Sequence, residues 1–164
     1  MIWFIALCIF IILLVMLTST RFEIRTQITI EAPRLKVWQA IIEMDKYDQW
    51  NSQIVYLGGE VRVGEKLHLK LTVDGIDPYE IRPEIGRWFR GEWLAWFTVT
   101  GTPRIFAREH FFELEETPEK HTRVINREEF RGILAFFLSP FPVIKGVPIS
   151  LEKMNQELRA YVER

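Results

Sequence analysis

Charged residues are missing from the first part of this chain, and cysteine is nearly missing from all of it. No Asp, Glu, Lys or Arg occurs in residues 1–20, so all 21 basic and 22 acidic side chains come later. The one cysteine is Cys8, and a single thiol excludes an intrachain disulfide or a thiolate metal cluster. The formal net charge of -1, without any basic cluster, gives no field that would hold a polyphosphate backbone. We therefore expect no nucleic-acid partner.

Several enzyme motifs are also absent. The sequence contains no nucleophile elbow, no phosphate-binding glycine loop and no dinucleotide fingerprint. His68 and His121 fall on separate predicted elements, and neither has a partner at metal-ligand spacing. We expect no metal and no other cofactor.

The uncharged segment predicts a membrane anchor over residues 1–20. Residues 1–17 are all apolar, and as a helix they would rise about 25 Å, or about 30 Å with Thr18–Thr20 included. A cleavable signal peptide would normally show a basic residue before the apolar stretch and small residues at a cleavage site, and neither is present. Arg21, Arg25, Arg34 and Lys36 follow the segment, so the positive-inside rule predicts a single-pass anchor with the globular part in the cytoplasm.

The rest of the chain has the length and pattern of one α+β domain. Thr26–Glu31 alternates like a half-buried strand, and Pro33 suits the first position of a helix that ends near Asp45. A last helix is expected from about Ser150, which suits an N-cap. Six further strands are predicted between these helices, over Gln53–Leu57, Leu67–Val73, Tyr79–Phe89, Trp93–Thr100, Phe106–Glu115 and Thr122–Phe130. The greasy stretch Ile133–Ile144 is left open as a lid, an interfacial segment or a buried loop.

This order of elements and several short motifs resemble the SRPBCC (START-like) superfamily, in its polyketide cyclase/dehydrase-like branch. The motifs are Ile30-Glu31-Ala32-Pro33, Val37-Trp38, Tyr47, Trp50-Asn51, Val63-Gly64-Glu65, Glu109–Glu115, Thr122-Arg123-Val124, Glu128–Gly132 and Met154–Leu158. The resemblance covers residues 24–164. It implies a helix-grip fold, in which a curved antiparallel sheet of about six to seven strands wraps on the C-terminal helix.

The two strands before the last helix carry the candidate polar site. Period-two alternation places Phe106, Arg108, His110, Phe112 and Leu114 on one face, with Val124, Asn126, Glu128 and Phe130 on one face of the next strand. If the apolar members mark the inner side, the side chains of His110, Asn126 and Glu128 converge under the C-terminal helix. They would act there as an acid-base group or as a structural polar pair.

The main functional hypothesis is a membrane-anchored domain that binds a hydrophobic small molecule or lipid between the sheet and the last helix. Two alternatives stay open: a cyclase- or dehydratase-like enzyme that uses His110 and Glu128, and a protein-interaction module with a filled interior. The sequence does not decide the oligomeric state. The cavity wall of the main hypothesis consists of Trp38, Leu94, Trp96, Phe112, Phe130, Met154 and Leu158.

Overall fold

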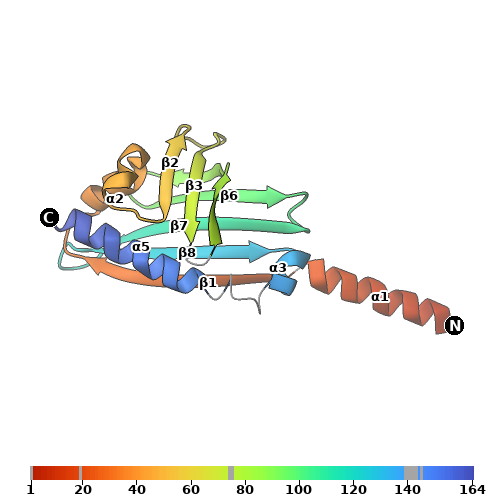
Figure 1. Ribbon diagram of the computed structural model, residues 1–164. Coiled ribbons are helices and arrows are strands. Elements are labelled where there is room, and N and C mark those ends of the chain that lie inside the picture. The colour runs from red at the N-terminus through yellow and green to blue at the C-terminus, as the bar shows by residue number, and fades with distance from the viewer. Residues whose placement is uncertain (1, 19, 74–75, 139–143, 145) are drawn as a thin grey trace.

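The computed structural model describes residues 2–18, 20–73, 76–138, 144 and 146–164, and it consists of one α+β domain with a projecting N-terminal helix (Figure 1). That helix, α1 (Ile2–Thr18), carries large apolar side chains that are almost fully exposed, such as Trp3 at 86%. No helix among these residues is long and apolar enough to cross a membrane, which differs from the transmembrane helix predicted over residues 1–20.

Two antiparallel sheets form the body of the domain. The larger sheet has the order β1-β8-β7-β6-β5 and the smaller one the order β2-β3-β4. The strands are β1 (Arg21–Ile30), β2 (Ile54–Gly58), β3 (His68–Val73), β4 (Ile76–Ile81), β5 (Glu84–Phe89), β6 (Trp93–Thr100), β7 (Phe106–Glu116) and β8 (Thr122–Arg131). The eight strands exceed the six to seven expected, but the antiparallel sheet closed by a C-terminal helix is confirmed.

Helices cover the inner side of this sheet. They are α2 (Arg34–Ile42), the 3-10 helix η1 (Met44–Gln49), the short α3 (Ile133–Leu138) and the C-terminal α5 (Val147–Val162). The α5 helix lies along β1 and β8 (Figure 1) and buries one stripe, Leu151, Met154, Leu158 and Val162, as its apolar spacing predicts. The main core lies between the C-terminal half of α5, α2 and the sheet, because Val162, Leu158 and Trp38 are all buried in one cluster.

Proline explains two differences from the predicted elements. The expected strand Tyr79–Phe89 is two strands, because Pro83 cannot donate a backbone hydrogen bond and the chain passes there from the small sheet to the large one. The last helix begins at Val147, not near Ser150, because Pro148 lies in its first turn, where a missing N–H costs nothing. Ser150 is therefore inside the helix, and its hydroxyl donates to the side chain of Gln53, the residue before β2.

Gly132 sets the position of α3 after β8. Its φ of +98° is unfavourable for other residues, and an added Cβ would lie 2.6 Å from the carbonyl oxygen of Ile105. The same close approach lets Leu134 N–H donate to that carbonyl at 3.0 Å. α3 is thereby fixed at the end of the sheet where α1 emerges (Figure 1). Residues 139–143, inside the stretch left open between lid, interfacial segment and buried loop, lie outside the described residues.

Candidate functional site

A cavity of about 630 Å³ lies between the inner face of β6–β8, the β3–β4 hairpin and the N-terminal half of α5. Leu138 of α3 and Ile144 also line it, so it is displaced from the main core toward the α3 end of the sheet. A volume of this size is ordinary for a small-molecule site. The apolar part of its wall includes Leu71, Ile76, Ile81, Trp96, Phe130, Leu151 and Met154.

The seven residues predicted as ligand contacts fall into two groups. Trp96, Phe130 and Met154 line the cavity. Trp38, Leu94, Phe112 and Leu158 are buried in the main core and are not part of the cavity wall. The reason is the position of α5, whose C-terminal half packs directly on α2 and the sheet and leaves space only under its N-terminal half.

Three charged or titratable side chains meet in the wall of the cavity. Antiparallel register places His110 opposite Glu128, and Arg108 is two residues before His110 on the same face of β7. Glu128 is 2% exposed and accepts two hydrogen bonds from the guanidinium group of Arg108. The Glu128 Oε1 atom also lies 3.0 Å from His110 Nδ1. The convergence of His110 and Glu128 predicted from alternation is therefore observed.

The Arg108 guanidinium keeps Glu128 ionised. Burial alone would raise the pKa of Glu128, but the charge of Arg108 and the hydrogen bonds from His110 and Arg108 lower this pKa to about 2. Burial acts in the opposite direction on Arg108, whose pKa is nevertheless raised by Glu128. Because Glu128 stays a carboxylate near neutral pH, it accepts hydrogen bonds and cannot supply a proton.

This carboxylate fixes the hydrogen-bonding roles of His110. Since an ionised carboxylate only accepts, the Nδ1 atom of His110 must carry the proton that it shares with Glu128. The imidazole ring also stacks on Trp96, with ring centroids 4.5 Å apart and planes 11° apart. Within the described part of the chain, His110 Nε2 has no hydrogen-bond partner, although the residue is only 4% exposed and lines the cavity. In the neutral ring this atom is an acceptor.

Asn126 serves a different purpose from His110 and Glu128. Its amide donates to Asn155 of α5 at 3.2 Å, and the Asn155 amide donates to Thr26 of β1 at 2.9 Å. Both asparagines are fully buried. These contacts hold α5 on the sheet, so the structural interpretation applies to Asn126.

Sequence reasoning missed Arg108 as a member of the site, although the same alternation that selected His110 places Arg108 on its face. It also missed the contribution of β4, where Ile76, Tyr79 and Ile81 line the cavity. The alternation of Tyr79 and Ile81 around Glu80 was the available signal, but it does not reveal that this strand belongs to a separate, smaller sheet.

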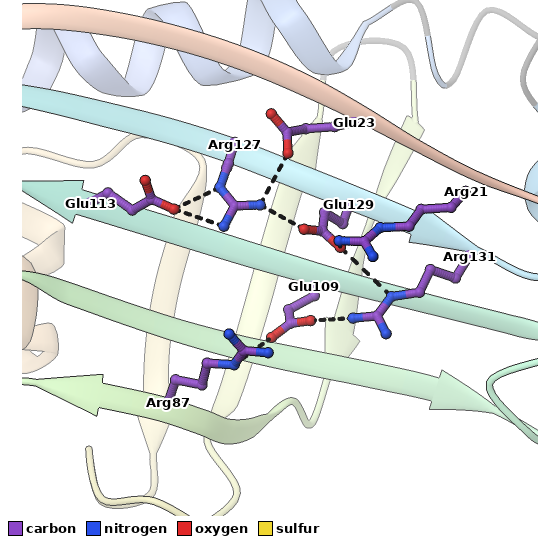
Figure 2. Close-up of polar contacts among 8 residues, drawn as sticks. All are labelled: Arg21, Glu23, Arg87, Glu109, Glu113, Arg127, Glu129 and Arg131. Carbon is purple, nitrogen blue, oxygen red and sulfur yellow. Dashed lines mark hydrogen bonds and ion pairs between the residues drawn. The ribbon is translucent and has the colours of Figure 1, made fainter.

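The outer face of the large sheet also carries charges, and these are mutually paired. Figure 2 shows four arginines and four glutamates gathered there. The Glu129 carboxylate lies 2.6 Å from Arg127 and 2.8 Å from Arg21, while Glu109 lies 2.6 Å from Arg131. Arg127 also contacts Glu113 and Glu23, and its guanidinium lies 3.6 Å from the centre of the Phe111 ring.

The other two histidines lie apart from the cavity. His68 pairs with Glu80 at 2.6 Å in the small sheet, and His121 precedes β8. No group of three or more His, Cys, Asp or Glu side chains within the described ranges is arranged to hold a metal ion.

Comparison with known proteins identifies the fold but no close relative. No family model matches the chain, and no curated protein matches it. Several solved structures do. The Zhui aromatase/cyclase from Streptomyces sp. R1128 has 12% identity and a TM-score of 0.64, with 88% of this chain and 95% of that chain covered.

Two further structures give the same result. Ara h 8.0201 matches with 14% identity and a TM-score of 0.65 over 87% of this chain and 98% of that chain. The di-domain ARO/CYC BexL from the BE-7585A biosynthetic pathway matches with 10% identity and a TM-score of 0.68, over 88% of this chain and 50% of that chain. At these identities the likeness concerns the fold alone, and it confirms the helix-grip fold predicted from the resemblance.

Proposed function

We propose that the protein binds a hydrophobic small molecule or lipid in the cavity between the large sheet, the β3–β4 hairpin and α5. The observation that carries this proposal is the cavity of about 630 Å³, which is lined mainly by apolar side chains and whose wall includes His110, with a buried Nε2 atom that has no partner among the described residues. An apolar cavity with a few convergent polar groups is the usual form of a small-molecule site. The cavity also counts against a pure protein-interaction module, for which a filled interior was expected.

Native mass spectrometry of delipidated protein after incubation with a membrane extract tests this proposal. The full chain should retain an added mass that corresponds to an apolar molecule. Thr98→Trp, which places an indole ring in the cavity wall on β6, should prevent this uptake. Thr29→Trp is the matched control, because Thr29 is exposed on β1. If wild-type protein takes up nothing, or if Thr98→Trp takes up as much as wild type, ligand binding in this cavity is excluded.

We also propose that α1 holds the domain at a membrane, with the globular part on the cytoplasmic side. Support comes from the exposed apolar surface of α1, where Trp3, Phe4 and Phe10 are each more than 60% exposed. The α1 helix lies beside α3, which contributes Leu138 to the cavity wall, so the anchor and the cavity share one end of the domain (Figure 1). Anchoring there would place the cavity close to a source of apolar ligands.

Flotation of the full chain with phosphatidylcholine vesicles tests the anchor. Wild-type protein should float with the vesicles, and the double variant Phe4→Arg, Ile11→Arg should remain in the dense fraction, because each buried arginine disfavours insertion. Leu35→Arg is the control, since Leu35 is an exposed apolar residue on α2. Flotation that is equal for both variants would contradict anchoring by α1.

A second candidate function is catalysis by the same polar group. It is favoured by the 3.0 Å contact between His110 and Glu128, which lies within hydrogen-bond reach. Because the Glu128 carboxylate stays ionised, His110 would be the proton carrier of this pair in a cyclase- or dehydratase-like reaction, and Glu128 would be its positioning residue. Two of the neighbouring structures are those of the Zhui aromatase/cyclase and of the di-domain ARO/CYC BexL. Recovery of the bound molecule unchanged after prolonged incubation would count against this candidate.

A further inference from the structure

We infer that the cavity selects apolar molecules that carry a hydroxyl group, and that His110 Nε2 accepts the hydrogen bond from this hydroxyl. This inference rests on the proposed function, because it names the class of ligand for the same cavity. The starting observation is that His110, a residue 4% exposed in the cavity wall, has a buried Nε2 atom without a partner among the described residues. A buried polar atom of this kind is costly unless a ligand or water satisfies it.

The neighbours of His110 define which group suits Nε2. Glu128 accepts a hydrogen bond from the protonated Nδ1, so the neutral ring presents a lone pair at Nε2. With His110 neutral, the charges of Arg108 and Glu128 cancel in its immediate surroundings, while Lys66, Arg82 and Glu84 line other parts of the cavity. A neutral O–H donor therefore matches this site, whereas a carbonyl or ether oxygen would place two acceptors opposite each other. An ionised carboxylate of a ligand is also an acceptor, so it would have to be protonated before it could donate a hydrogen bond to Nε2.

The ring cannot turn to offer a different group. Trp96 stacks on one face of the imidazole, and Phe112 meets it edge-on with ring centroids 4.9 Å apart. The Arg108 guanidinium donates two hydrogen bonds to the Glu128 carboxylate, and this carboxylate accepts the hydrogen bond from His110 Nδ1. Arg108 and Glu128 are thus positioning residues, and the direction of the Nε2 lone pair is fixed before a ligand enters. The hydroxyl of the ligand must approach in the plane of the ring, while its apolar body contacts Phe130, Leu151 and Met154.

Paired titrations of the full chain with naphthol and with its methyl ether test this inference. The two probes share an aromatic body, but only naphthol donates a hydrogen bond. Wild-type protein should bind naphthol about three- to tenfold more tightly, as expected for one net hydrogen bond. His110→Phe, which keeps a ring against Trp96 and leaves the Arg108–Glu128 pair in place, should bind both probes equally. His121→Phe is the matched control and should keep the wild-type preference.

This inference is overturned if wild type does not prefer naphthol to its methyl ether, or if His110→Phe keeps that preference. In either case, binding of both probes leaves the proposed function intact. If wild type binds neither probe and also takes up no molecule from a membrane extract, the proposed function fails and this inference with it. Should His110→Phe not fold, the ¹⁵N imidazole spectrum of wild type decides. Naphthol should shift the Nε2 resonance of His110 and the methyl ether should not, and equal shifts would overturn the assignment.

Discussion

The two faces of the large sheet differ in how their buried carboxylates are paired with basic side chains. On the outer face, each of the buried carboxylates Glu109 and Glu129 lies close to more than one arginine, and these arginines are partly exposed (Figure 2). On the inner face, Glu128 has one arginine and one histidine, and one nitrogen of that histidine has no partner among the described residues.

The difference separates a structural arrangement from a functional one. Arg127 and Arg131 of the outer face each contact at least two carboxylates, so the loss of any one contact is shared among the others. The inner group has no such redundancy, because Arg108, Glu128 and His110 form a short chain that ends in a cavity. Charge pairs in the same sheet thus stabilise on one side and, we propose, select a ligand on the other.

Glu128→Ala should lower the free energy of unfolding by about 3 kcal/mol, measured by urea denaturation. The variant leaves Arg108 and His110 in the cavity wall without their shared partner, and removing one member of a buried pair is strongly destabilising. Part of the Arg108 side chain is exposed, at 29%, so the lower end of the usual range applies. A loss below about 1 kcal/mol would mean that the inner group is as redundant as the outer one.

Acid should destabilise the wild type more than Glu128→Gln. The pKa of Glu128 is lowered to about 2 from 4.5, so its stabilising contribution is complete above about pH 5 and is lost as the pH falls toward 2. The lost contribution is at most about 3 kcal/mol. Unfolding midpoints of both proteins between pH 5 and pH 2 measure it, and the other carboxylates cancel in the comparison. Parallel curves for the two proteins would show that Glu128 is not held in its charged form.

Glu129→Ala on the outer face should cost about 1–2 kcal/mol, less than Glu128→Ala. Glu129 is 4% exposed, but the arginines that surround it keep Glu113, Glu23 and Glu109 as partners. Urea denaturation at neutral pH compares the two variants directly. If Glu129→Ala proves the more damaging, the contrast between the faces is reversed.

Glu23→Gln should change stability by no more than about 0.5 kcal/mol. Its carboxylate is 41% exposed and pairs at 3.1 Å with an arginine that has two other carboxylate partners. The same urea titration serves here, repeated at high salt, where the small difference should vanish. A larger effect would show that the ion pairs of the outer face depend on the exposed Glu23 carboxylate.

The sequence predicted those features that local patterns determine. Alternation placed His110 and Glu128 on one face, and the spacing of Leu151, Met154 and Leu158 gave the buried stripe of α5. The partition between cavity and core was not predictable, since Phe112 and Trp96 lie on the same face of the sheet and in the same core cluster, and only Trp96 also lines the cavity. Asn126 has the same pattern as Glu128, but its partner Asn155 arrives from a helix far along the chain.

Proline and a chain crossing account for the remaining differences. The sequence around Pro83 predicts one continuous strand, because both halves alternate. The observed division depends on pairing, because each half pairs with strands of a different sheet. The role of Arg108 depended on where Glu128 would be, which is a matter of register between strands and not of either strand alone.

Methionine methyl NMR of the full chain, with naphthol as the added ligand, provides the most direct test of ligand binding in the cavity. Met154 lines the cavity, and Met44 is buried in the main core outside it. If naphthol binds in this cavity, it should shift the Met154 methyl resonance and leave that of Met44 unchanged. A shift of Met44 alone, or no shift of Met154 at saturating naphthol, would contradict a binding cavity on the inner face of the sheet.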